Sequence, residues 1–379
     1  MKVIRVLHVI GAGEFGGAER HILNLVAAMN PEKVRVTVCC LFAEPFVKVA
    51  KEKGLDALAI PMRHKRDMGI IKQLKALMLQ EKVDIVHTHG VRANLVGRLA
   101  AKQAGKKIVV TTEHSLLAQD YPGFLSRMLN MLIEKFSRPI TTHFIAVSDG
   151  LRRALLKQGI SENKITVIHN GLNPEDFVTH QPLDFWRQKL HIEASVPVVG
   201  IVGRLHPVKG HRYFLQAAQQ ILQTKPEVRF LVVGDGSERP SLEAYAAELG
   251  ITDQVIFTGF VKEVAEIMPA LNVLVIPSLW EGFGLTALEG MVLKVPVLAS
   301  SIGGLPEVVE DEYTGLLVPP ADSQALAEKT LWMLDNPEET RILSQNALKV
   351  LQEKFTSQVM AAKTEQLYAW LLAKSREKI

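Results

Sequence analysis

Short runs of apolar, mostly β-branched residues alternate along the chain with longer stretches in which apolar residues recur every three or four positions. The short runs predict buried strands, and the longer stretches predict helices with one buried face. In the first half, strands are expected over residues 3–10, 34–41, 85–88, 108–112, 144–147 and 165–168, with a helix over 18–29. Strands that alternate with helices in this way indicate a parallel sheet covered on both faces.

The pattern restarts after a polar, irregular stretch over residues 182–196. Further strands are expected over residues 198–203, 230–233, 255–258, 273–276, 296–299 and 316–318, with a helix over 211–223. A chain of 379 residues has room for two domains, because domains usually span about 100–200 residues. We therefore predict an α/β protein with one domain over residues 1–180, a second over 190–355, and a terminal helix over 356–379 that packs back on the first domain.

Cysteine usage and the N-terminus bear on where the protein works. The two cysteines, Cys39 and Cys40, are adjacent, so a disulfide framework is excluded and a reducing cytosol fits best. Arg5 and His8 interrupt the first apolar run, which argues against a secretion signal. Since no run of eighteen apolar residues occurs, no membrane-spanning helix is expected either. We expect a cytoplasmic protein.

Charge is distributed unevenly. Residues 1–180 hold 26 Lys and Arg against 16 Asp and Glu, whereas residues 181–379 hold 18 against 24. A basic first half suggests an anionic partner such as the inner membrane face, although solvated surface charge is an equal alternative. The helix pattern over 124–136 also has two interpretations. It is either a core-facing helix or a membrane-surface helix, joined by a basic cluster with Arg63, Lys65 and Arg66.

A glycine-rich turn over residues 11–16, GAGEFG, matches the dinucleotide-binding pattern G-x-G-x-x-G after a strand. The next strand ends without the carboxylate that would hold a ribose, which disfavours a nicotinamide or flavin site. Gly16 and Gly17 are instead expected to bring backbone N–H groups toward a ligand, with a simple tight turn as the alternative.

Two loops open the second domain. Residues 203–210, GRLHPVKG, place Arg204 and Lys209 just beyond a strand, where two cations would stabilise a diphosphate. Residues 232–237, VVGDGS, end the next strand, and Gly234 would let a phosphate or base approach closely. A plain strand-to-helix turn is the alternative for this second loop.

The segment over residues 277–290, PSLWEGFGLTALEG, carries the most informative pattern. Glu281 is expected on a loop, and Glu289 about one turn inside a helix that starts near Leu285. Gly282 and Gly284 would expose N–H groups at the helix start, which attract phosphate. Two carboxylates beside a phosphate site suit the hydroxyls of a sugar and of a ribose, as in a nucleotide sugar.

Three histidines lie at the ends of first-domain strands. His114 is a candidate to touch a reacting sugar, and His89 is a weaker candidate on the acceptor side. A zinc site at His87 and His89 is disfavoured, because opposite faces of the strand would separate the rings and no cysteine helps.

With these motifs, the chain resembles glycosyltransferase family 4. EGFGLTALEG at 281–290 looks like that family's E-x7-E motif, supported by GGAER at 16–20, VHTHG at 86–90, AVSDG at 146–150, VIHNGLNPEDF at 167–177 and TGLLVPP at 314–320. The resemblance implies the GT-B fold, with two facing Rossmann-like domains, a cleft between them, and a C-terminal helix that crosses back to the first domain. It also implies an acceptor in the first domain, a nucleotide sugar mainly in the second, retention of anomeric configuration, and no metal or other cofactor.

By the same resemblance, Glu281 would hold donor-sugar hydroxyls and Glu289 the ribose. Arg204 and Lys209 would neutralise the diphosphate, and His114 would contact the donor sugar. The remaining donor-site residues expected from the loops and the resemblance are Gly16, Gly17, Gly234, Gly282, Phe283, Gly284 and Leu285.

We therefore expect transfer of a hexose or N-acetylhexosamine from a nucleotide sugar, UDP-linked by default, to a lipid-linked, saccharide or small-molecule acceptor. No nucleic-acid partner is expected. A sugar-nucleotide epimerase or a phosphorylase on the same fold, and a sugar-nucleotide-binding protein without catalysis, are the alternatives.

Overall fold

The computed structural model describes residues 3–11, 16–64, 67–116 and 124–377, with side chains from residue 128 onward in the last range, and every structural statement below concerns these residues. The chain divides into two compact units. Residues Met1–Leu172 and Thr356–Ile379 form the first, and Asn173–Phe355 forms the second.

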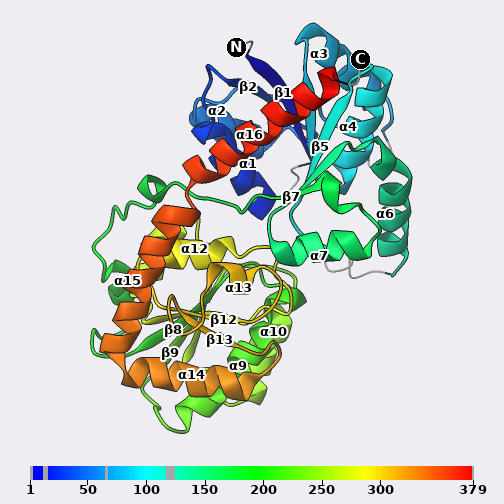
Figure 1. The fold of residues 1–379 in the computed structure, drawn as a ribbon. Helices are drawn as coiled ribbons and strands as arrows, with labels where there is room; N and C mark the ends of the chain where they lie inside the picture. The colour runs from blue at the N-terminus through cyan, green and yellow to red at the C-terminus, as the bar shows by residue number, and fades with distance from the viewer. Residues whose placement is uncertain (1–2, 12–15, 65–66, 117–123, 378–379) are drawn as a thin grey trace. The chain divides into compact units, whose positions relative to one another are not determined.

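The first unit is built on a seven-stranded parallel sheet with the order β3-β2-β1-β4-β5-β6-β7 (Figure 1). Its strands are β1 (Ile4–Ile10), β2 (Val34–Cys40), β3 (Ala57–Ala59), β4 (Ile85–His89), β5 (Ile108–Glu113), β6 (His143–Ala146) and β7 (Ile165–Val167). Its helices include α1 (Gly17–Ala28), α2 (Phe46–Glu52), α3 (Ile70–Gln80), α4 (Val91–Gln103), α6 (Phe124–Ser137) and α7 (Asp149–Lys157). The strand order reverses between β1 and β4, the place where ligands bind in open α/β sheets.

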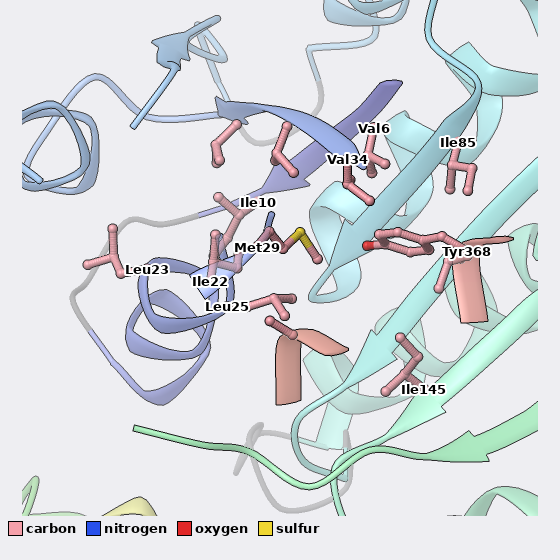
Figure 2. Close-up of a cluster of buried hydrophobic side chains, with 14 of the residues drawn as sticks. Val6, Ile10, Ile22, Leu23, Leu25, Met29, Val34, Ile85, Ile145 and Tyr368 are labelled. Carbon is pink, nitrogen blue, oxygen red and sulfur yellow. The ribbon is translucent and has the colours of Figure 1, made fainter. Parts of the chain in front are cut away.

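The terminal helix α16 (Ser357–Arg376) completes the core of the first unit. The Thr356 side chain caps it by accepting a hydrogen bond from the Val359 amide. Tyr368 and Leu371 are buried among side chains of β1, β2, β4 and α1. Figure 2 shows Tyr368 together with Val6, Val34 and Ile85 of this cluster. Residues at the far end of the sequence are therefore integral to the first sheet's packing.

The second unit repeats the plan with six parallel strands in the order β10-β9-β8-β11-β12-β13. The strands are β8 (Val198–Val202), β9 (Arg229–Val233), β10 (Val255–Gly259), β11 (Val273–Ile276), β12 (Val297–Ser300) and β13 (Leu316–Val318). Its helices are α8 (Phe185–Lys189), α9 (His211–Leu222), α10 (Arg239–Glu248), α11 (Val264–Ile267), α12 (Leu285–Val292), α13 (Leu305–Val308), α14 (Ser323–Asp335) and α15 (Pro337–Lys354). Here the order reverses between β8 and β11.

Helix α6 leaves apolar side chains exposed from Met128 to Phe136, so of its two interpretations the core-facing one does not hold for these residues. Its inward side is polar: Glu134 and Ser137 are buried, and both accept hydrogen bonds from the buried guanidinium of Arg98 on α4, at 2.6 and 2.9 Å. The exposed apolar side chains of the helix are Met128, Leu129, Met131, Leu132 and Phe136. A buried arginine requires polar partners, and that requirement determines which side of α6 faces inward.

Candidate functional site

Two loops meet at the reversal of the second sheet. The loop after β8 runs through residues 203–210, and the loop after β11 leads into α12. The Leu279 amide donates to the Val208 carbonyl at 2.7 Å. Gly210 has a φ of +72°, and a Cβ there would lie 1.9 Å from the Pro277 oxygen. The two loops therefore approach so closely that only glycine fits between them.

An ion pair joins these loops. Lys209 Nζ lies 2.6 Å from Glu281 Oε2, and Ser278 Oγ donates to the same oxygen at 3.2 Å. The side chains of Lys209 and Glu281 are 28% and 17% exposed, so solvent still reaches both. Glu281 lies on the loop before α12, as the sequence predicts.

Helix α12 begins at Leu285, as predicted, after Gly284 with a φ of +111°. Glu289 is buried one turn inside it, with 4% exposure. Phe283 is buried too, and its ring packs edge-on against Phe355 with 5.7 Å between centroids. The Phe283 side chain therefore belongs to the core.

The two glycine-containing loops of the second unit pack on each other. A Cβ on Gly234 would lie 2.0 Å from the Gly203 oxygen, and one on Gly236 would lie 2.4 Å from the Leu205 oxygen. Close backbone approach explains both glycines and favours the strand-to-helix turn as the interpretation of residues 232–237. Arg204, in the same loop as Gly203, is exposed.

In the first unit, the start of α1 is closed by its own residues. The Gly16 amide donates to Glu19 Oε2 at 2.9 Å, and the helix begins at Gly17. This uses the Gly16 N–H that was expected to face a ligand. The preceding turn, residues 12–15, lies outside the described residues.

Five histidines gather at the reversal of the first sheet: His8 on β1, His21 on α1, His87 and His89 on β4, and His114 after β5. The His87 and His89 ring centroids lie 4.3 Å apart. The expectation that the strand separates them is wrong, because residues two apart in a strand point to the same face.

A continuous chain of hydrogen bonds links four of these histidines to Tyr368. Thr112 Oγ1 contacts His87 Nε2 at 2.6 Å, and His87 Nδ1 contacts the Tyr368 hydroxyl at 2.6 Å. The same hydroxyl contacts His8 Nε2 at 3.1 Å. His8 Nδ1 then contacts His89 Nε2 at 3.0 Å, and His89 Nδ1 contacts His114 Nε2 at 3.1 Å.

Burial keeps all five imidazoles neutral. It lowers the pKa of His8 to about 3 and that of His21 to about 4. The pKa values of His87, His89 and His114 lie well below 6.5 for the same reason.

Neutral imidazoles are also metal ligands. Nitrogen atoms of His8, His87 and His89, and likewise of His21, His89 and His114, lie within 4.8 Å of one another. Most of these nitrogens already hydrogen-bond to a neighbouring side chain.

Of the four acceptor-side candidates, the structure describes His89 and Arg63, and their environments differ. His89 is 1% exposed and lies inside the hydrogen-bond chain. Arg63 is exposed, and its amide donates to Asp67 Oδ2 at 3.0 Å. Lys65 and Arg66 lie outside the described residues.

Four residues of this group are not predicted from the sequence: His8, His21, Asn170 and Tyr368. His8 interrupts an otherwise apolar strand, which is a signal for a buried polar group that needs a partner. His21 Nδ1 donates to Asn170 Oδ1 at 2.8 Å, and these two residues are 149 positions apart.

Comparison with known proteins agrees with the geometry. Residues 183–350 match the family described as Glycosyl transferases group 1, and residues 15–176 match Glycosyltransferase Family 4. A D-inositol 3-phosphate glycosyltransferase of Streptomyces avermitilis is 30% identical, over 87% of this chain and 78% of its own. A UDP-Gal:alpha-D-GlcNAc-diphosphoundecaprenol alpha-1,3-galactosyltransferase of Escherichia coli is 27% identical over 96% of both chains.

Solved structures share the architecture. HepE of Anabaena in complex with UDP-glucose has a TM-score of 0.84 at 22% identity, over 99% of this chain and 100% of HepE. Sucrose-phosphate synthase of Thermosynechococcus elongatus has a TM-score of 0.83 at 26% identity, over 98% and 100%. The predicted α/β fold with two Rossmann-like domains of the GT-B type is confirmed. The chain belongs to the group 1 glycosyltransferases, with the N-terminal region of glycosyltransferase family 4.

Proposed function

We propose that this glycosyltransferase moves a hexose or N-acetylhexosamine from a UDP-linked sugar to a lipid-linked, saccharide or small-molecule acceptor, with retention of anomeric configuration. The observation that carries the proposal is the Lys209–Glu281 pair, which places a cation and a carboxylate together at the reversal of the second sheet. A nucleotide sugar needs both, since its diphosphate is anionic and its sugar is rich in hydroxyls.

Each part of the nucleotide sugar would have a partner of matching chemistry in the second unit. Lys209 and Arg204 would bind the diphosphate, together with the main chain of residues 282–285 at the start of α12. Glu281 would accept hydrogen bonds from sugar hydroxyls. Glu289 is buried one turn along the same helix and would hold the ribose.

The relatives' names support the choice of nucleotide and acceptor. The Escherichia coli relative is named for UDP-Gal as donor and for an acceptor linked to diphosphoundecaprenol. It matches this chain over 96% of its length. We extend both features to this chain, a UDP-linked donor and a lipid-linked acceptor as the first acceptor class to test.

The charge that develops on the leaving group during the reaction determines what the site must stabilise. As the glycosidic bond to the diphosphate breaks, negative charge builds on the leaving phosphate, and Lys209 and Arg204 would stabilise it without a metal ion. A phosphate oxygen of the leaving group would help to deprotonate the acceptor hydroxyl on the same face of the sugar. No side-chain nucleophile is required, and His114 would bind the reacting sugar.

A peripheral position at the inner membrane face would fit a lipid-linked acceptor. Helix α6 exposes Met128, Met131 and Phe136, and Phe136 is 80% exposed. Exposed Lys135 lies between them on the same helix. Apolar and basic side chains on one exposed surface suit the interface of an anionic bilayer. None of the described helices is long and apolar enough to cross the bilayer.

A donor screen followed by product analysis tests the proposal. UDP-, GDP-, ADP- and dTDP-sugars are titrated by calorimetry, and the sugar that binds is then offered with an undecaprenyl-diphosphate-linked saccharide, with and without a chelator. We expect a UDP-sugar to bind, the chelator to have no effect, and NMR of the product to show the donor's anomeric configuration. Conversion of the donor without acceptor would indicate an epimerase, dependence on free phosphate a phosphorylase, and binding without turnover a non-catalytic protein.

A further inference from the structure

The hydrogen-bond chain from Thr112 to His114 permits only two arrangements of its hydrogens. Each neutral imidazole has one N–H and one bare nitrogen, so it donates on one side and accepts on the other. The Tyr368 hydroxyl could accept from both neighbouring imidazoles, but its own hydrogen would then be buried without a partner among the described residues. It therefore also donates on one side and accepts on the other. Reversing one bond therefore reverses every other bond, from Thr112 Oγ1 to His114 Nδ1.

The two arrangements differ at the ends of the chain. In one, His114 Nε2 donates to His89, and every bond points from His114 toward Thr112. The Thr112 hydroxyl then accepts from His87, and its own hydrogen has no partner among the described residues. Thr112 lies within β5 at 1% exposure, which leaves no access for a ligand, whereas His114 follows the end of the strand and is only partly buried as a residue. In the other, the Thr112 hydroxyl donates to His87, and the last hydrogen lies on His114 Nδ1. That nitrogen is buried without a partner among the described residues, and a ligand oxygen can satisfy it.

A second unpartnered nitrogen lies beside it. The His21 ring packs edge-on against the His114 ring, with 4.7 Å between centroids. His21 Nδ1 donates to the Asn170 carbonyl oxygen at 2.8 Å, which leaves Nε2 as a bare acceptor. His21 Nε2 is buried and has no partner among the described residues. The neighbouring imidazoles thus offer one donor and one acceptor, which is the complement of a hydroxyl group.

We propose that Tyr368 of the terminal helix is a positioning residue which, through His8 and His89, holds His114 with its proton on Nδ1, so that His114 donates to a substrate hydroxyl and His21 accepts from it. The assignment of that hydroxyl to the substrate rests on the proposed function. The proton position on His114 does not, because it follows from the hydrogen-bond chain alone.

Imidazole nitrogen NMR reads the proton position directly. Long-range proton–nitrogen spectra of the full chain labelled with ¹⁵N-histidine distinguish a protonated nitrogen from a bare one, and a His114→Asn variant assigns the His114 signals by their loss. We expect protonated Nδ1 and bare Nε2 on His114, and the same on His87, His89 and His8. A protonated Nε2 on His114 would overturn the proposal whatever the activity assays give.

Two amide substitutions test the role in turnover. The side-chain NH₂ of asparagine takes roughly the place of Nδ1, and that of glutamine takes the place of Nε2. His114→Asn should therefore retain about tenfold more kcat than His114→Gln, the effect of one hydrogen bond formed in the transition state. If both variants lose the same amount of kcat and the histidine resonances show the expected pattern, the substrate contact is refuted, but the hydrogen-bond chain is not.

Tyr368→Phe tests the positioning role, with Trp370→Phe as the matched control. Trp370 lies on the same helix and contacts His143, which is not part of the hydrogen-bond chain. Tyr368→Phe should shift the nitrogen resonances of both His8 and His87 and lower kcat about fivefold with little change in KM. Trp370→Phe should change neither.

Thr112→Val and Thr112→Ser test the same chain from its other end, should Tyr368→Phe fold poorly. Valine removes the hydroxyl at constant shape and should shift the His87 resonances, whereas serine should preserve them. Unshifted His8 and His87 signals in Tyr368→Phe, or unshifted His87 signals in Thr112→Val, would overturn the positioning role.

Discussion

Lys209 Nζ and Glu281 Oε2 lie 2.6 Å apart, although 72 positions separate the two residues in the sequence. One follows β8 and the other follows β11, and these strands are neighbours at the reversal of the second sheet. The pair shows how two unrelated motifs become one site. A diphosphate bound as proposed would compete with Glu281 for the ammonium group of Lys209.

Removing the charge of Glu281 should abolish most of the turnover. Glu281→Gln keeps the size of the side chain but weakens its hydrogen bonds to sugar hydroxyls, and we expect kcat/KM to fall by about 10²–10³-fold. Initial rates with the best UDP-sugar measure this. Glu310, which pairs with Lys354 at 2.9 Å on the surface of the same unit, gives the matched control, and Glu310→Gln should leave the rate within a factor of two. Equal rates for Glu281→Gln and the control would refute the assigned role.

Gly210 should be far less replaceable than Gly250. Both have a φ near +70°, but a Cβ on Gly250 meets nothing within 4 Å, whereas one on Gly210 meets the Pro277 carbonyl. Gly250→Ala should cost about 1 kcal/mol for the left-handed backbone, and Gly210→Ala at least ~2 kcal/mol more. Urea unfolding followed by circular dichroism measures the difference. If the two variants lose the same free energy of unfolding, the loops do not approach as described.

A double-mutant cycle should detect the contribution of the buried Arg98–Glu134 pair to the free energy of unfolding. Arg98→Met leaves the Glu134 carboxylate buried without its cation, which should lower the free energy of unfolding by about 3–5 kcal/mol. Adding Glu134→Leu to that variant should recover most of the loss. A double variant as unstable as Arg98→Met alone would show that the pair does not govern the packing of α6.

The exposed side of α6 should bind anionic membranes. Phe136→Glu should weaken binding to phosphatidylglycerol vesicles about tenfold, because it removes apolar area and adds a like charge. Flotation of the protein with vesicles measures this. Phe260→Glu changes a comparably exposed phenylalanine of the second unit and serves as the control. Unchanged flotation for Phe136→Glu would remove α6 from the membrane proposal.

The histidine group should make the protein sensitive to acid. In the folded chain the pKa of His8 is lowered to about 3 and that of His21 to about 4, whereas unfolded histidines titrate near 6.5. Between these values the unfolded state binds more protons, so the free energy of unfolding should fall as pH drops from 6.5 toward 4. Urea unfolding at intervals of half a pH unit measures the slope. A flat profile over this range would mean that these imidazoles are protonated in the folded protein.

The fold could be predicted because parallel strands are buried on both faces and read as apolar runs, such as residues 273–276, which form β11 as expected. Edge strand β3 has three residues and gives no such signal. The loop position of Glu281 and the start of α12 at Leu285 could be predicted because the residues that determine them are close in sequence. The histidine chain could not, since Tyr368 meets His8 across 360 positions and only the folded topology brings them together.

Helix α6 shows a different failure of pattern analysis. Its apolar spacing is that of an amphipathic helix, and the usual inference is that the apolar side faces the core. Arg98 lies 36 positions before Glu134 in the sequence and is fully buried. Because its guanidinium needs a buried polar partner, Glu134 and the polar side of α6 face inward. The periodicity correctly indicated a helix, but not which environment its apolar side would meet.

Calorimetric titration of UDP into the wild-type chain, Lys209→Met and Lys354→Met tests the central claim most directly. Lys209 and Lys354 each form an ion pair in the second unit, but only Lys209 lies at the reversal of the sheet. We predict that UDP binds the wild type and Lys354→Met equally and binds Lys209→Met at least about tenfold more weakly, because a diphosphate loses one charge-assisted hydrogen bond. Equal affinity of UDP for all three proteins would contradict a donor site at Lys209 and Glu281.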